Sequence, residues 1–217
     1  MGFDKKSTIE EFGSQFTVYN NIDGYWGSVD MLRDTVYPFD LNDIKDKKIC
    51  EVGSGSGRII NKLNLFNPSK IIAVEPSKAI EVAKKNNEKS SIEFLNIRGQ
   101  DLNYNDELDY IFSLGVIHHI PEYDIVCKKI YKSLKPGGKF IIWVYGYENN
   151  QLYLKIFNNL RRITRIIPDF LLRILSKFLN LSAILYIFLC KIFNMPLKDY
   201  FKNVFSKCSY KKREEII

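Results

Sequence analysis

Three glycines that alternate with serines follow a short apolar run of the sequence. With the two residues that precede the first glycine, they form the segment Glu51-Val52-Gly53-Ser54-Gly55-Ser56-Gly57. Glycine has no Cβ, so it lets the backbone turn sharply and approach a ligand closely. A helix that begins after such a turn presents N–H groups that have no partner within the helix. The segment therefore predicts a site at which backbone atoms bind a polar group.

The two histidines of the chain, His118 and His119, are a second candidate for chemistry. The reference pKa of histidine, ~6.5, suits a general base that takes a proton from a hydroxyl or an amine near neutral pH. The four cysteines, by contrast, show neither CxxC spacing nor the spacing of metal ligands. We therefore predict no metal site, and we interpret the cysteines as buried or incidental thiols in a reducing compartment.

The elements that position these residues follow from the pattern of apolar and polar residues. Short apolar runs alternate with helix-like segments in the middle of the chain, which is typical of βαβ architecture. Right-handed crossovers then predict a Rossmann-like, doubly wound, mostly parallel sheet that binds ligands at the carboxyl ends of its strands. We expect five strands, at 48–52, 71–75, 92–97, 108–114 and 139–145, and helices at 58–66, 78–88 and 122–134.

One α/β domain with an appendage at each end fits the size of the chain. Its 217 residues, 46% of them hydrophobic, can bury one sizeable core. Residues 1–40 contain an aromatic-rich segment that could cap this core, which covers 41–146. Residues 147–217 have helical spacing and predict a basic, amphipathic, all-α appendage, with helices at about 150–166, 169–193 and 197–208.

The net charge of +7 is concentrated in the last third of the chain. From residue 151 onward, 13 Lys and Arg face four acidic residues, so this part carries +9 and the rest carries −2. A basic surface can bind nucleic acid, anionic lipid or an anionic substrate, but basic residues scattered over helices usually face solvent. We expect no nucleic-acid partner.

The apolar residues of the appendage, such as Leu172 and Phe178, could form a lid, a homodimer interface or a lipid-facing surface. We favour the first two, with peripheral membrane contact as the alternative. The uncharged stretch 178–190 is shorter than the ~20 residues of a membrane-spanning helix, and Arg173 and Lys177 precede it, so we predict no transmembrane span. The N-terminus shows no secretory signal, and we therefore expect a cytoplasmic protein.

The spacing of the glycines discriminates between ligands. Dinucleotide-binding turns follow G-x-G-x-x-G, whereas this turn reads G-x-G-x-G and has Arg58 where the third glycine belongs. The turn instead resembles motif I, E/D-x-G-x-G-x-G, of the class I S-adenosylmethionine-dependent methyltransferases. The segments LDYIFSLGVIHHI and LKPGGKFIIWV are also similar to those of small-molecule members, so that the resemblance covers about 47–145.

This resemblance implies S-adenosylmethionine as the cofactor and assigns roles to particular residues. Glu51 would face the amino group of the cofactor, Glu75 would accept hydrogen bonds from both ribose hydroxyls, and the segment 99–102 would bind the adenine. Two of these residues keep structural alternatives, Glu75 as a helix cap and Asp101 as a plain turn residue. The implied cofactor-binding residues are Glu51, Gly53, Ser54, Gly55, Gly57, Glu75, Pro76, Gln100, Asp101 and Leu114.

The histidines also receive roles from the resemblance. His118 matches a position that faces the pocket in some members and is the candidate catalytic base. His119 matches a position that many members fill with histidine whatever they methylate, which indicates a structural role. Methyl transfer from a sulfonium can also proceed by alignment and desolvation alone, without a base.

The end of the chain departs from the family, whose members normally finish with two more strands. No such pair follows Tyr145 in this sequence. We favour a chain that stops within or after a helical insertion; the alternative is that helices cover the fifth strand as an edge. The expected function is methyl transfer to a small-molecule or amphipathic acceptor, such as a quinone, lipid or sugar precursor. Two alternatives are an NAD(P)-dependent oxidoreductase and a non-catalytic cofactor-binding or assembly protein.

Overall fold

The structure of the chain is a computed structural model that describes residues 5–18, 22, 27–88, 91–146, 164, 167–195, 198, 201 and 206. The chain divides into two compact units, Met1–Tyr145 and Gly146–Ile217. The first unit contains both the predicted core and the predicted N-terminal cap. The predicted helices at about 150–166 and 197–208 lie almost wholly outside the described residues.

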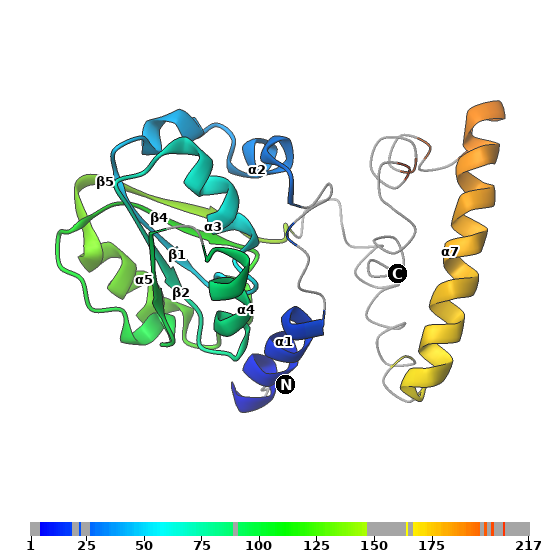
Figure 1. Cartoon of the computed structure of the whole chain (residues 1–217), viewed down its shortest axis with the longest axis horizontal. Helices are drawn as coiled ribbons and strands as arrows, with labels where there is room; N and C mark the ends of the chain where they lie inside the picture. Colours follow the sequence, from blue (N-terminus) through cyan, green and yellow to red (C-terminus); the bar gives the residue numbers. More distant parts are fainter. Residues whose placement is uncertain are drawn as a thin grey trace. The chain divides into compact units, whose positions relative to one another are not determined.

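The first unit is built on a sheet of five parallel strands (Figure 1). The strands are β1 (Lys48–Val52), β2 (Lys70–Val74), β3 (Ile92–Leu95), β4 (Leu108–Leu114) and β5 (Leu134–Trp143). Their order in the sheet is β3-β2-β1-β4-β5. The expected Rossmann-like, doubly wound architecture is thereby confirmed, and the strand order reverses between β1 and β4.

Both faces of the sheet are covered, which explains why its central strands are continuous apolar runs. Successive residues of β1 point to opposite faces: Ile49 packs with Leu32 and Ile60 in one cluster, and Cys50 packs with Val126 in the other. The helices of the unit are α1 (Lys5–Val18), α2 (Val29–Val36), α3 (Arg58–Leu63), α4 (Ala79–Asn86) and α5 (Tyr123–Ser133). The partners of Ile49 and Cys50 come from α2, α3 and α5. Short 3-10 turns are η2 (Leu41–Ile44), η3 (Asn64–Phe66), η4 (Gly99–Asp101) and η5 (Ile117–His119).

The last strand begins five residues earlier than the sequence predicts, at Leu134 instead of Lys139. The segment 135–138 is a break in the pairing with β4, because Leu108 pairs with Leu134 and Tyr110 already pairs with Lys139. An irregularity of this kind tolerates a proline, which has no N–H for the ladder. Gly138 fits there because a Cβ would lie 3.0 Å from the Asp109 carbonyl oxygen.

The outer edge of β5 has no strand partner among the described residues. Apolar side chains near its end are exposed, namely Ile142, Trp143, Val144 and Tyr145. Neither of the two additional strands that the family resemblance implies occurs in the described part of the chain.

The second unit is described mainly through one long helix, α7 (Asp169–Ile192). This helix matches the one predicted at about 169–193, and it includes Arg173 and Lys177, whose charges the sequence analysis used against a membrane span. Among the described residues, one helical stretch, Phe170–Ile192, is long and apolar enough to cross a membrane by length and composition.

Candidate active site

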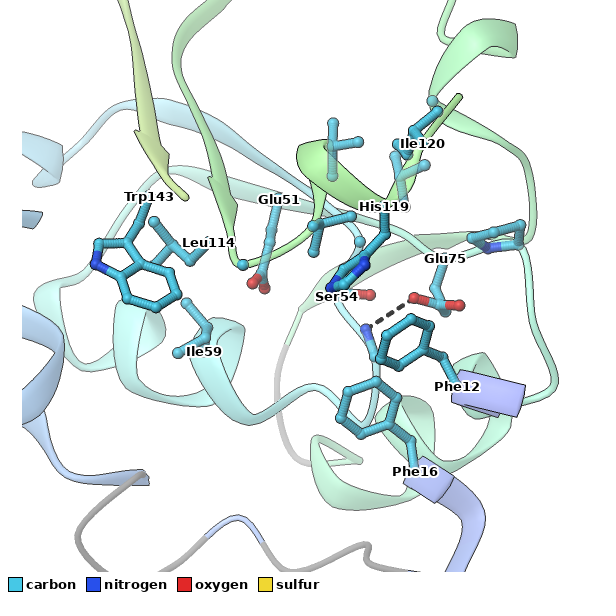
Figure 2. Close-up of a pocket in the computed structure, with 18 of the residues that line it drawn as sticks. Phe12, Phe16, Glu51, Ser54, Ile59, Glu75, Leu114, His119, Ile120 and Trp143 are labelled. Carbon is cyan, nitrogen blue, oxygen red and sulfur yellow. Dashed lines mark hydrogen bonds between the residues drawn. The ribbon is translucent and has the colours of Figure 1, made fainter. Parts of the chain in front are cut away.

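A cavity of about 400 Å³ opens at the carboxyl ends of β1, β2, β4 and β5 (Figure 2). This volume is within the range of ~300–1,000 Å³ that is usual for small-molecule sites. The place is the one that a doubly wound sheet favours, because the chain leaves β1 and β4 toward opposite faces of the sheet. The glycine turn after β1 forms the centre of the lining.

Hydrogen bonds to the neighbouring strand hold the glycine turn. The N–H groups of Gly53 and Ser54 both donate to the carbonyl oxygen of Val74, over 2.8 and 3.0 Å. Gly53 has φ +85°, and a Cβ on it would lie 2.5 Å from a methyl group of Val116. The turn therefore requires glycine at this position both for its backbone conformation and for its packing.

Gly57, also predicted to bind the ligand, is not among the residues that line the cavity. It precedes α3 with φ +79° and packs against α4, since a Cβ on it would lie 3.0 Å from the Ala83 Cα and 2.5 Å from the side-chain nitrogen of Asn87. That nitrogen also donates to the Gly57 carbonyl oxygen over 3.2 Å. The third glycine thus joins two helices and does not contact the cavity.

Glu75 follows β2 and fixes the glycine turn from the side. Its Oε2 accepts a hydrogen bond from the N–H of Gly55 over 2.9 Å (Figure 2). Its Oε1 accepts one from the N–H of Ser77 over 3.0 Å. The carboxylate lines the cavity although its residue is only 8% exposed. Each carboxylate oxygen has a further lone pair, so Glu75 can accept additional hydrogen bonds from a ligand hydroxyl.

Glu51, at the end of β1, is buried with one carboxylate oxygen unsatisfied. Its residue is 2% exposed, and Oε2 has no hydrogen-bond partner among the described residues. Burial, opposed by the charge of Arg58 and reinforced by that of Glu75, raises the pKa of Glu51 to about 8. The hydroxyl of Ser54 is likewise buried without a partner in the described part of the chain. Both groups line the cavity and are available to a ligand.

One wall of the cavity comes from α1, which the sequence analysis assigned to a cap and not to the site. Phe12 and Phe16 line the cavity, and a Cβ on Gly55 would lie 3.1 Å from the ring of Phe16. The helix can approach closely because Gly13 faces Ser77, where a Cβ would come within 2.8 Å of the serine Cβ. The signal for this wall was the density of aromatic residues near the N-terminus.

The histidines occupy different environments in η5. His119 is half-buried, lines the cavity and packs on the ring of Phe12 with 4.8 Å between ring centroids. His118 is exposed and does not line the cavity, and partial burial lowers its pKa. The sequence interpretation chose His118 as the candidate base, but the structure places His119 at the cavity. Consecutive side chains in a 3-10 helix point about 120° apart, so a difference of one residue is enough to turn a side chain away from the cavity.

The end of the cavity away from Glu75 is apolar. Trp143 ends β5 and Tyr145 follows the strand, and their rings meet edge to face with 4.9 Å between centroids. Leu114 from β4 and Ile59 from α3 complete this part, and Figure 2 shows Trp143, Leu114 and Ile59 grouped on one side of Glu51. In the same view, Phe12, Phe16 and Glu75 are grouped on the other side.

The structure brings most of the predicted residues to one place. Asp101 does not line this cavity but a smaller hollow beside Asn96 and Arg98. Gln100 does line it, and its side-chain nitrogen also lies 3.4 Å from Glu122 Oε2. The predicted residues at the cavity are Glu51, Gly53, Ser54, Gly55, Glu75, Pro76, Gln100 and Leu114, whereas Gly57, Asp101 and His118 lie outside its lining.

Comparison with known proteins gives one family match and several partial relatives. Residues 50–142 match the methyltransferase domain family. The tRNA U34 carboxymethyltransferase of Campylobacter fetus subsp. fetus is 34% identical over 125 residues, 56% of this chain and 43% of that protein. The ubiquinone biosynthesis O-methyltransferase of Rickettsia bellii (strain OSU 85-389) is 31% identical over 105 residues, 46% of this chain and 43% of the relative. The chain matches less than half of the length of these curated relatives.

A solved structure with the same fold is that of the PH0226 protein from Pyrococcus horikoshii OT3. The TM-score is 0.56 at 23% sequence identity, over 71% of this chain and 72% of that chain. At this identity the similarity concerns the fold alone.

Proposed function

We propose that the chain, whose residues 50–142 match the methyltransferase domain family, transfers a methyl group from S-adenosylmethionine to a small apolar acceptor. The observation that carries the proposal is the unsatisfied carboxylate oxygen of Glu51 beside the glycine turn. A buried polar atom without a partner costs ~1–3 kcal/mol, so this site favours a ligand that brings a donor. The ammonium group of S-adenosylmethionine is such a donor, and the residues present therefore fit the cofactor.

The residues around the turn divide the binding of the cofactor between them. Glu51 and Ser54 would bind the polar amino-acid end, and Glu75 would accept hydrogen bonds from the ribose hydroxyls with its remaining lone pairs. Gln100 and the apolar Ile120 also line the cavity and would contact the adenine. When bound, S-adenosylmethionine supplies a methyl group on a positively charged sulfur, a good leaving group for in-line displacement by an acceptor atom.

The acceptor would occupy the apolar end of the cavity. Trp143, Leu114 and Ile59 offer aromatic and aliphatic surface there, with few polar groups to bind a sugar or a charged substrate. Such surface favours a flat, apolar molecule with a hydroxyl group, of the quinol type. Closing this wall around the acceptor would also exclude water from the reacting atoms.

The proton of an acceptor hydroxyl needs a destination, and His119 is the histidine that lines the cavity. A neutral imidazole at that position could take the proton as the new bond forms. The role of His118 as the base, expected from the sequence, stays a prediction. Because its side chain is exposed, a substitution at His118 is the control for a substitution at His119.

Calorimetry with S-adenosylhomocysteine, followed by transfer of labelled methyl groups to a panel of simple quinols, sugars and lipids, tests the proposal. We expect binding of S-adenosylhomocysteine, no binding of NAD and label in the apolar quinols. Binding of NAD in place of S-adenosylhomocysteine would support the oxidoreductase alternative. Tight binding of S-adenosylhomocysteine with no transfer to any quinol, sugar or lipid acceptor would support a non-catalytic cofactor-binding protein.

A further inference from the structure

The long helix α7 exposes large apolar side chains that a surface helix of a water-soluble protein would turn inward. Large apolar side chains with helical spacing form an exposed stripe, here called the outer stripe: Phe170, Ile174, Phe178, Leu181, Leu185, Phe188 and Ile192, each between 57% and 69% exposed. The opposite side carries Asn180, Ala183 and Cys190, which are 0%, 8% and 1% exposed. A surface helix in water shows the opposite distribution, with its apolar stripe inward.

From this exposed apolar stripe we infer that the outer stripe of α7 binds the surface of a lipid bilayer, with the helix axis along the membrane plane. A helix of 24 residues is ~36 Å long, and its apolar side chains are exposed over this whole length. Amphipathic helices of this kind bury their apolar face at the boundary between headgroups and acyl chains. The hydroxyl of Ser182, beside the stripe, donates to the Phe178 carbonyl oxygen over 3.0 Å and so needs no water as an acceptor.

The charges of the unit fit an anionic membrane. Residues 151–217 carry +9, and the exposed Lys177 and Lys191 lie on the same flank of the helix, between the outer stripe and the inward side. Basic groups in that position reach the headgroups of anionic lipids while the apolar side chains enter the acyl region. A membrane-spanning orientation is disfavoured, because it would bring the charge of Lys177 into the hydrocarbon layer.

The width of the exposed apolar surface favours lipid over a second copy of the chain. A helix that pairs with one partner helix needs only a narrow seam of apolar residues. Beside the outer stripe, Leu171, Leu175 and Leu179 are also 44%, 44% and 45% exposed. The apolar arc is thus broader than such a seam, as expected for a surface that a fluid phase covers.

Flotation of the full-length chain with lipid vesicles tests the inference. We expect the chain to float with vesicles of equimolar phosphatidylcholine and phosphatidylglycerol, and at least about tenfold less with phosphatidylcholine alone. Phe178→Ser combined with Leu181→Ser should lower the partition into the mixed vesicles roughly 100-fold. Lys177→Gln combined with Lys191→Gln should weaken the preference for the anionic lipid but keep binding through the stripe.

A matched control exists in the first unit. Leu65 and Tyr131 are 63% and 83% exposed there, and changing both to serine should leave flotation unchanged. All variants should retain binding of S-adenosylhomocysteine, which keeps this inference separable from the proposed activity. Flotation of the Phe178/Leu181 variant at the wild-type level would overturn the inference. So would a wild-type chain that does not float but forms a stable dimer that this variant abolishes.

Discussion

The exchange Glu51→Gln should weaken cofactor binding and at the same time stabilise the ligand-free protein at alkaline pH. A charge-assisted hydrogen bond contributes ~1.5–3 kcal/mol, so replacing the carboxylate that would bind the cofactor's ammonium should raise the Kd about 10- to 150-fold. The effect is this large because Glu51 is only 2% exposed and its Oε2 has no hydrogen-bond partner among the described residues. No surface contact would produce so large a change.

The pH dependence of stability has the opposite sign. The pKa of Glu51 is raised from 4.5 to about 8 in the folded protein, so the folded state holds a proton that the unfolded state releases. Stability from this group is present below pH ~4.5 and is lost as pH rises through about 8. Glutamine does not titrate, and the variant should therefore lose less stability than the wild type over this interval.

Calorimetry with S-adenosylhomocysteine and thermal denaturation between pH 5 and 9 would measure both effects. Glu81→Gln is the control, because this carboxylate on α4 has a side chain that is 70% exposed. An unchanged Kd for Glu51→Gln would refute the assignment of this carboxylate to the ammonium group. A melting temperature of the variant that follows the wild-type pH profile would refute the raised pKa.

Three further changes test other parts of the site and core. Gly55→Arg should abolish S-adenosylhomocysteine binding in calorimetry, because the new side chain meets the ring of Phe16 and the residue has φ +52°; measurable binding would contradict the placement of the cofactor. Trp143→Ala should raise the KM for an apolar acceptor about tenfold or more through lost contact area, while the Kd of S-adenosylhomocysteine stays unchanged. An equal rise in the acceptor KM and in the Kd of S-adenosylhomocysteine would place Trp143 elsewhere in the site. Phe112→Ala should cost ~3–5 kcal/mol of unfolding free energy in urea titration, since Phe112 is 0% exposed; a loss below 1 kcal/mol would contradict such packing.

The sequence predicted the strands well where burial alone defines them. The bounds of β1 and β4 match the predictions, because each is an apolar run that ends at a glycine or a turn. The start of β5 was missed because Pro136 and two glycines read as a loop, whereas pairing with β4 extends the strand through an irregularity. Local signals cannot reveal such tertiary pairing.

The site was predictable to the extent that it follows from topology. Glu51 lies near the end of β1 and Glu75 directly follows the neighbouring parallel strand β2, so their meeting at one edge follows from the sheet order. The contribution of Phe16 was not predictable in the same way, since it depends on how α1 packs on a turn that lies about 40 residues further along the chain. The choice between His118 and His119 depends on the direction of one 3-10 turn, which composition does not determine.

The hydrogen bond between the Gly55 N–H and Glu75 has a consequence for how the site responds to change. This bond joins two groups of the protein itself, so the entropy of aligning the turn with the carboxylate is lost during folding and not during binding. A preorganised pair of this kind acts as one thermodynamic unit, and substitutions at its two ends should be strongly non-additive in a double-mutant cycle. Residues that would each contact a different part of the cofactor thus contribute to its affinity jointly.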